Sequence, residues 1–361
     1  MNHEATGHEK DASSMENPQD VTSPQEPKQP SMWGRLAKIV GSLVIAGVLL
    51  WFSLRGIDLQ EFWQQLQRVP LGWVWIFIPV AILSHLFRAL RWRLLIEKEG
   101  SEAKTSTLFA GVMLGYFMNF LVPRLGEITR PVYVARKINA SSSWMIGTIV
   151  LERIIDLLIL IGLFFFVILA LLSDSSVVTG LLGTDEVPTT LLLGIVAAAL
   201  IVLGLIWIGL KGIMASRDRL PAPVQKIADL IVSFGQGVLS IRGLKTWPQF
   251  TGYTILTWLG YIAMSYLPFF AIETVQSGVT LGFTEAIVIT VVAGIGITIP
   301  TPGGIGTYHL FVQQALFLLY GVPLVEGLAY ATLSHGLGMI VILVSTPILL
   351  WFDKNFTNDA L

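Results

Sequence analysis

The sequence predicts an all-α polytopic membrane protein, and three observations point to this fold class. Hydrophobic residues make up 53% of the 361 residues and charged residues only 13%, against roughly a quarter charged in an average soluble domain. The mean hydropathy is +0.70. The apolar residues also fall in uninterrupted blocks that approach or exceed the ~20 residues that a helix needs to cross ~30 Å of hydrocarbon. We therefore expect these blocks to lie in a membrane.

About six of these blocks are long enough to be full membrane spans. They comprise residues 38–54, 71–92, 144–172, 190–210, 249–272 and 324–351. The polar residues 1–32 are rich in Pro, Glu, Gln and Ser, which predicts a disordered tail without a signal peptide. Residues 353–361 follow the last span as a short terminal segment.

Lysine and arginine residues set the expected orientation of the spans. The segment 211–247 carries six of them, whereas 173–188 and 273–282 carry none. Basic loops remain in the cytoplasm, so both ends of the chain are expected there. Two other stretches, 57–69 and 222–241, have apolar residues at helical spacing and are expected to lie along the membrane interface.

Two shorter apolar stretches, 107–122 and 283–299, end in proline–glycine breaks. The first has basic segments on both sides and the second has none on either side, so neither fits a single crossing. We expect two opposed re-entrant helical hairpins, which return through 127–137 and 307–320. With their flanking spans they predict an inverted repeat, the arrangement with which many transporters build a site at the membrane midplane. Eight simple crossings remain the alternative.

The breaks define the expected hairpin tips. Their residues are Pro123, Gly126, Pro300, Pro302, Gly303, Gly304 and Gly306. Non-helical backbone at membrane depth is tolerated only where protein or a water-filled cavity surrounds it, so a tip inside the membrane marks a candidate site. Glycines in the second tip permit close backbone approach, and their amides are candidates for binding an anion.

Polar residues at the first tip are candidate ligands for a lipid headgroup: Asn119, Arg124, Glu127 and Arg130. A guanidinium group donates two parallel hydrogen bonds to a phosphate, and we expect Glu127 to hold one of the two guanidiniums in place. The alternative is that arginines here anchor the chain at the headgroups. That interpretation is preferred for Arg136 and Lys137.

A second charged cluster, Glu152, Arg153 and Asp156, lies within one predicted span. Its spacing places all three residues on a broad face of one helix, and ionisable groups inside hydrocarbon require a partner or a function. We expect the cluster either to hold helices together, with Arg124 or Arg130 as partners, or to contact a substrate. Both roles stay open from the sequence.

Other polar residues receive structural interpretations. Arg88, Arg91 and Arg93 follow the end of a predicted span and are interpreted as orientation signals, with an inward-facing Arg88 left open. His309 and His335 are candidates for a proton relay, but a hydrogen-bonded structural histidine is the preferred interpretation for each, and also for His85.

Several function classes are excluded by what the sequence lacks. It has no cysteine, and no phosphate-binding loop, H-E-x-x-H or G-x-S-x-G motif. No nucleophile lies beside a base, so we expect no catalytic residue, no metal and no cofactor. The net charge of −1 gives no reason to expect a nucleic-acid partner.

Four segments resemble one known family in their order and spacing. They are FRALRWRLL at 87–95, NFLVPRLGEITRP at 119–131, LERIIDLL at 151–158 and PTPGGIGTYH at 300–309. They resemble the lysylphosphatidylglycerol synthase transmembrane-region family, the flippase-like membrane domain of the bacterial multiple peptide resistance factor. The resemblance covers residues 33–352.

The resemblance implies a single flippase-like domain of about eight membrane segments, multi-pass in a bacterial inner membrane, that handles or translocates lipid. It carries over to these positions: Asn119, Pro123, Gly126, Glu127, Arg130, Glu152, Arg153, Asp156, Pro300, Gly303 and Gly304. The sequence departs from the two-domain synthases because no soluble aminoacyltransferase domain follows residue 352. We therefore do not expect it to make lysyl-lipid by itself.

The expected function is binding or translocation of a phosphate-bearing lipid, either a membrane phospholipid or a polyprenyl-phosphate. The alternative is a membrane-embedded accessory subunit or transferase in lipid-linked glycosylation or lipid modification. Homo-oligomer formation is left open by the sequence.

Overall fold

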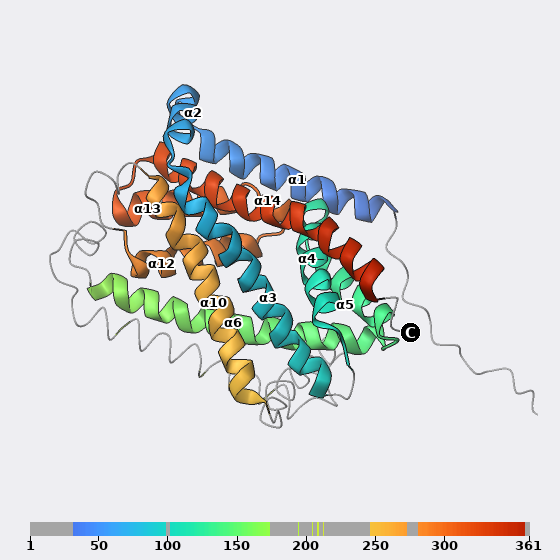
Figure 1. Cartoon of the computed structure of the whole chain (residues 1–361). Coiled ribbons are helices and arrows are strands. Elements are labelled where there is room, and N and C mark those ends of the chain that lie inside the picture. The colour runs from blue at the N-terminus through green and yellow to red at the C-terminus, as the bar shows by residue number, and fades with distance from the viewer. Residues whose placement is uncertain are drawn as a thin grey trace, which may run out of the picture. The chain divides into compact units, whose positions relative to one another are not determined.

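The computed structural model describes residues 32–98, 102–173, 246–272 and 281–357, and in addition a few isolated positions between 173 and 246. The described residues from Ile39 onward belong to one compact unit, and the contacts described below lie within it. All described elements are helical (Figure 1): α1 Met32–Leu54, α2 Leu59–Arg68, η1 Leu71–Trp73, α3 Val74–Lys98, α4 Thr105–Leu121, α5 Gly126–Lys137, α6 Ser142–Ser173, α10 Trp247–Tyr266, η4 Leu267–Ala271, α12 Phe283–Thr298, η5 Pro302–Gly304, α13 Thr307–Tyr320 and α14 Leu324–Thr357.

Four stretches of helix in the described part are long and apolar enough to cross a membrane. They are Leu71–Glu97, Ser142–Leu171, Trp247–Ala271 and Leu324–Lys354, and they coincide with four of the predicted spans. The first predicted span corresponds to α1, which is joined to α2 by a bend of 87° and counts as a fifth if the pair is one span. The predicted span 190–210 and the amphipathic stretch 222–241 lie outside the described residues.

Helix α2 is the amphipathic helix expected within 57–69. It begins where the Asp58 side chain accepts hydrogen bonds from the amides of Gln60 and Glu61, which satisfies donors that a helix start leaves unpaired. Its residues Leu59 and Trp63 are exposed. An apolar exposed face beside the end of a span is typical of a helix that rests on a membrane surface.

Exposed tryptophans lie near the two ends of the apolar helices. Trp63 and Trp75 lie near the start of α3, with side chains 60% and 79% exposed. Helix α10 runs antiparallel to α3, since Phe77 clusters with Leu267 while Phe87 stacks on Tyr253. Trp247 at the start of α10 therefore lies at the opposite end, and it is 60% exposed. Tryptophan is enriched at both membrane–water interfaces, so this placement fits a chain that crosses a bilayer.

Helices α4 and α5 form the first expected hairpin. They run antiparallel and touch closely at glycines: Gly111 faces Val134, and a Cβ on Gly115 would lie 3.1 Å from the Cβ of Arg130. At Gly126 an added Cβ would collide with the backbone carbonyl of Gly115. The chain turns between the helices through Arg124, whose φ is 63°. Only small residues allow two helix backbones to approach this closely, which is why the glycines are needed here.

Helices α12 and α13 form the second expected hairpin. Gly296 near the end of α12 packs against Phe311 of α13, so these helices also run antiparallel. Three glycines of the intervening loop, Gly303, Gly304 and Gly306, have positive φ, a conformation that other residues adopt only with strain. Both hairpins are therefore present as helical hairpins, while their entry into a membrane from opposite sides stays a prediction.

The tips of the two hairpins are in contact. The Arg124 side chain donates a hydrogen bond from Nη2 to the backbone carbonyl of Thr298, at 3.3 Å. A Cβ on Gly303 would lie 2.5 Å from the Phe120 ring. Two segments that are about 180 residues apart in the sequence thus meet at the points where the two hairpins reverse direction.

Candidate functional site

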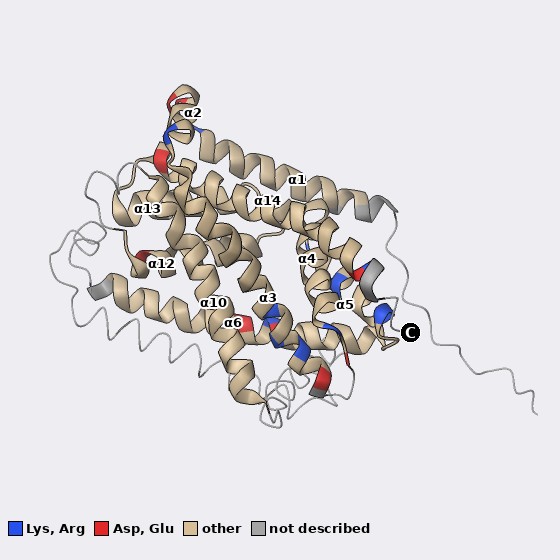
Figure 2. Ribbon diagram, viewed as in Figure 1, with Lys and Arg blue, Asp and Glu red and all other residues tan. Residues whose placement is uncertain are grey.

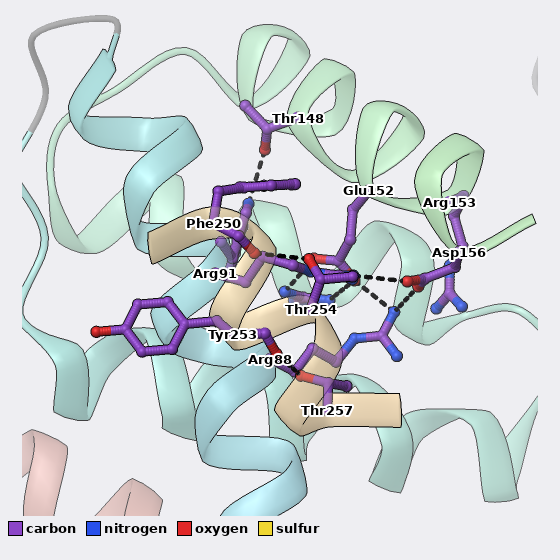
Figure 3. A network of polar contacts seen from close by, with 12 residues as sticks. Arg88, Arg91, Thr148, Glu152, Arg153, Asp156, Phe250, Tyr253, Thr254 and Thr257 are labelled. Carbon is purple, nitrogen blue, oxygen red and sulfur yellow. Dashed lines mark hydrogen bonds and ion pairs between the residues drawn. The ribbon is translucent and has the colours of Figure 1, made fainter. Parts of the chain in front are cut away.

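Five charged side chains from three helices meet inside the helical bundle (Figure 3). They are Arg88 and Arg91 of α3, Arg130 of α5, and Glu152 and Asp156 of α6. Figure 3 labels all of them except Arg130. Four of the side chains are at most 5% exposed, and Asp156 is 14% exposed. Figure 2 shows that few other charged residues of the described part lie on the neighbouring ribbons of α10, α12 and α13. We call these five residues the arginine cluster.

Glu152 lies at the centre of the arginine cluster. Its two carboxylate oxygens accept hydrogen bonds from Nη1 and Nη2 of Arg130, at 3.0 Å and 2.9 Å. Its Oε1 also accepts a hydrogen bond from Nη2 of Arg88. Paired, parallel hydrogen bonds between a guanidinium and a carboxylate are the strongest form of this contact. Glu152 therefore fixes α5 and α3 to α6.

Asp156 is held less completely. Its Oδ2 accepts a hydrogen bond from Arg88 Nη2 at 3.0 Å. Its Oδ1 lies 2.8 Å from Nη1 of Arg91, which makes an ion pair. Asp156 therefore has two arginine partners, whereas Glu152 has three, with Arg91 at 3.7 Å as the third. Asp156 is also the more exposed of the two carboxylates.

Aromatic side chains orient the guanidinium groups. Nη1 of Arg88 donates to the hydroxyls of Tyr116 and Tyr261, at 2.8 Å and 2.9 Å. The guanidinium carbon of Arg130 lies 4.0 Å from the centroid of the Trp92 ring, a cation–π contact. The indole of Trp92 in turn donates to Thr148 at 2.8 Å. The positions of two of the three arginines are thus fixed by rigid rings.

The arginine cluster contains three guanidinium groups and two carboxylates, which leaves one positive charge in excess. Several of its buried nitrogens make no hydrogen bond in the described part of the chain: Nε of Arg88, Nε of Arg130 and all three nitrogens of Arg91. Burying an unpaired charge or donor is costly. A further anion would satisfy both the charge and the donors.

The arginine cluster lies well inside two of the helices that carry it, α3 and α6. At 1.5 Å per residue, Arg88 is about 14 Å from the Glu97 end of its span. Glu152 is about 15 Å from the Ser142 end of its own span, by the same rise. Arg91 is about 9 Å from the Glu97 end, by the same rise. The charges on α3 and α6 therefore lie inside the apolar spans and not at their ends.

The structure brings only some of the predicted site residues together. Arg130, Glu152 and Asp156 belong to the arginine cluster, and the Arg130–Glu152 contact is one of the pairings that the sequence left open. Arg153 lies apart: its side chain is 45% exposed, and its Nε is 3.9 Å from Glu127. The sequence predicts that Glu127 holds a guanidinium of the first tip, whereas in the structure its ion-pair partner is Arg153 of α6.

Two other predicted ligands have local contacts at the first tip. Asn119 accepts a hydrogen bond from the amide of Gly126 at 2.8 Å, so it stabilises the start of α5. Arg124 is exposed and contacts the second tip through the carbonyl of Thr298. Of the two predicted phosphate-binding arginines, Arg124 is at the surface and Arg130 is inside the arginine cluster.

The second tip differs in one respect from its expected role. The amide of Gly304 donates to the carbonyl of Thr301 at 3.1 Å, so that amide is engaged within the loop rather than free for an anion. The carbonyl of Gly303 is bonded to Nε2 of His335 at 2.9 Å. His335 also stacks on Tyr308, with ring centroids 4.5 Å apart. The tip is thereby fixed to α14.

The remaining tip residues support this loop. Pro302 is buried and Pro300 is exposed. A Cβ on Gly306 would collide with the carbonyl of Ala46 in α1. The tip residues of the second hairpin therefore serve close packing, in accordance with their small or rigid side chains.

Sequence reasoning missed Arg91 and the aromatic residues around the arginine cluster. The position of Arg91 after a predicted span end favours an orientation signal, but its side chain is fully buried. A usable signal was present, because Arg88, Arg91 and Trp92 share a helix face at spacings of three and four. No group of three or more histidine, aspartate or glutamate residues in the described part is arranged to hold a metal ion.

Apolar helices that enclose a buried ionic cluster define an integral membrane protein. Residues 39–345 match the family described as the lysylphosphatidylglycerol synthase TM region, and the chain belongs to that family. The family predicted from the four sequence segments is thereby confirmed.

Curated relatives are named as membrane proteins of the UPF0104 group. One from Pyrococcus horikoshii is 22% identical over 303 residues, which cover 79% of this chain and 87% of the relative. One from Methanocaldococcus jannaschii is 31% identical over 145 residues, 38% of this chain and 56% of the relative. A second from that organism is 24% identical over 137 residues, 37% of this chain and 41% of the relative. No solved structure matches the chain.

Proposed function

We propose that this membrane protein binds a phosphate-bearing lipid headgroup and moves it between the leaflets of the bilayer. The observation that carries the proposal is the excess of one guanidinium over the carboxylates in the arginine cluster. Ion pairs that serve only to hold helices together need no surplus charge. A surplus inside apolar helices favours a site for an anion that enters from outside the chain.

The hairpin geometry supports movement rather than binding alone. Helix α5 has 12 residues and α13 has 14, so they are about 18 Å and 21 Å long and too short to cross ~30 Å of hydrocarbon. Hairpins of this length that meet at their tips fit two re-entrant units, one from each leaflet. Together with the six full spans expected from the sequence, they would form an inverted repeat about a midplane site.

Arg124 is the residue suited to first contact with a headgroup. Its guanidinium is exposed, lies between the two tips and has a single described hydrogen bond, to the carbonyl of Thr298. Arg130 is six residues further along and belongs to the arginine cluster. A phosphate passing between the hairpins would meet Arg124 before it reaches the buried arginines. We place both chain ends on the cytoplasmic side of a bacterial inner membrane, from the charge of the loops.

The test is headgroup transfer in proteoliposomes that carry an acyl-labelled phospholipid, followed by chemical quenching of the label in the outer leaflet. Arg124→Ala and Arg130→Ala are each expected to reduce the transfer rate to that of protein-free vesicles. Arg136→Ala is the matched control, because Arg136 is exposed on the same helix as Arg130 and outside the cluster.

Thermal unfolding of each purified variant separates loss of function from loss of fold. Arg124→Ala is the more informative substitution, since an exposed side chain contributes little to stability. Unchanged transfer in a folded double variant that lacks both arginines would remove the proposed role. Mass spectrometry of lipids that copurify with the wild type would identify the headgroup.

A further inference from the structure

We infer that the Asp156 carboxylate occupies the anion site of the arginine cluster when no lipid is bound, and that an incoming phosphate group displaces this carboxylate from Arg88 and Arg91. The inference rests on the proposed function and adds to it the identity of the carboxylate that the phosphate replaces. It assigns different roles to two carboxylates of one helix: Glu152 is a permanent structural partner, and Asp156 is a replaceable one.

The contacts of the two carboxylates differ in the way this exchange requires. Both oxygens of Glu152 are bonded to Arg130, one of them also to Arg88, and its side chain is fully buried. Asp156 has one hydrogen bond, to Arg88, and an ion pair with Arg91, and it has no contact with Arg130. Among the five members of the cluster its side chain is the most exposed, at 14%. Asp156 is therefore the acceptor that has fewer partners and is the more reachable.

The donors that Asp156 would release are suited to a phosphate. Nη2 of Arg88 lies 3.0 Å from Oδ2, and Nη1 of Arg91 lies 2.8 Å from Oδ1. Two guanidinium donors that now face two oxygens of a carboxylate would face two oxygens of a phosphate equally well. The buried nitrogens of Arg91 that make no hydrogen bond would gain acceptors.

Charge supports the exchange as well, because a phosphate monoester carries close to two negative charges and the carboxylate that it replaces carries one. With Asp156 in place the cluster carries a net charge of +1, and without it the net charge is +2. Removing Asp156 therefore strengthens the attraction for an anion and also removes the group that helps to expel it. A carboxylate that competes with the ligand makes binding weaker and release faster, which a protein that must let go of its cargo requires.

The experiment measures lipid retained by the full-length protein after purification in detergent. The protein is equilibrated with phosphatidic acid, which presents a phosphate, or with diacylglycerol of the same acyl chains, which presents none. Asp156→Asn is expected to retain about tenfold more phosphatidic acid than the wild type, from the loss of one nearby charge. Retention of diacylglycerol is expected to stay the same. In proteoliposomes Asp156→Asn should transfer phosphatidic acid more slowly.

Two variants serve as controls. Asp156→Glu keeps the charge and is expected to retain phosphatidic acid at the wild-type level. Glu97→Gln removes a negative charge from the end of the α3 span, where Glu97 pairs with the half-exposed Arg93, and is expected to change nothing. Added inorganic phosphate distinguishes the source of the anion: competition would mean that any phosphoryl group binds, and its absence would mean that the lipid headgroup is required. The exchange holds in both cases.

The failures of the two proposals are distinguishable. If the wild type retains no more phosphatidic acid than diacylglycerol, the headgroup site itself is wrong and the exchange falls with it. If the wild type does retain phosphatidic acid but Asp156→Asn retains the same amount or less, the exchange alone is overturned. Infrared difference spectra of the wild type provide a test without a variant. Phosphatidic acid is expected to change a carboxylate stretching band, and an unchanged band would overturn the exchange.

Discussion

Glu152 accepts two parallel hydrogen bonds from the guanidinium of Arg130. This contact joins the first hairpin to α6 inside the apolar bundle. We predict that Glu152→Gln lowers the free energy of unfolding by about 3–5 kcal/mol, since it leaves three buried guanidiniums with one carboxylate. The measurement is denaturant or thermal unfolding in detergent.

Glu127→Gln is the control for Glu152→Gln. Glu127 also lies near an arginine, but both side chains are 45% exposed and 3.9 Å apart, and exposed ion pairs contribute roughly 0–1 kcal/mol. Equal effects of the two substitutions would contradict the structural role given to Glu152.

Gly126→Ala is predicted to separate α4 from α5. Its Cβ would collide with the backbone carbonyl of Gly115, which is not able to move aside as the end of a flexible side chain would. We expect a loss of more than about 3 kcal/mol in unfolding free energy, within the range of severe substitutions. Gly147→Ala in α6 meets nothing within 4 Å and should be neutral or slightly stabilising. A tolerated Gly126→Ala would speak against the close approach of the helices.

Asp353 near the end of α14 holds the open end of the first hairpin. It accepts hydrogen bonds from Thr107 of α4 and Tyr133 of α5, and lies 3.2 Å from Nζ of Lys137. Asp353→Ala is predicted to accelerate amide hydrogen exchange in α4 and α5, since buried donors lose their acceptor at about 1–3 kcal/mol each. Exchange in α10, which supplies none of these three partners, provides the internal reference. Equal exchange of α4 and α5 in the wild type and in Asp353→Ala would show that the hairpin is held by other contacts.

The contact between the hairpin tips is testable by crosslinking, because the chain has no natural cysteine. Cysteines introduced together at Arg124→Cys and Thr298→Cys are predicted to be joined by a short bis-maleimide reagent. The reason is that the Arg124 side chain reaches the Thr298 carbonyl at 3.3 Å. Arg136→Cys paired with Thr298→Cys is the control, since Arg136 lies at the far end of α5 from the tip. Equal crosslinking of both pairs would contradict the observed geometry.

The second tip depends on His335. Its Nε2 is bonded to the carbonyl of Gly303, and its ring stacks on Tyr308. His335→Phe keeps a stacking ring and removes only the hydrogen bond, whereas His335→Ala removes both. We predict graded acceleration of hydrogen exchange at residues 300–306, larger for alanine than for phenylalanine. An identical response would show that stacking does not hold the tip.

Local patterns in the sequence determine most of the fold. Proline and glycine at positions 123–126 and 300–306 interrupt apolar helices, and the structure places a chain reversal at each. The span ends at Leu71 and Leu324 also follow from hydrophobicity alone, because the length of a membrane helix is set by the bilayer. These features depend on neighbouring residues, so a single sequence is sufficient to predict them.

The site was predicted less completely, because it depends on contacts between distant helices. Glu152 and Asp156 were recognised as costly charges inside a span. Arg91 was not, since an arginine near a span end has an adequate explanation as an orientation signal. Its burial results from the way α6 crosses α3, and no local pattern encodes that crossing. The partner of Glu127 was missed for the same reason.

The acceptor that Arg124 uses on the second hairpin is a main-chain oxygen. Every residue type at position 298 supplies such an oxygen, so the contact between the tips is insensitive to substitutions on that side. This hydrogen bond depends on one long basic side chain at position 124. The tips also meet where Gly303 lies against the Phe120 ring, so position 303 has to stay small while position 298 is free to vary.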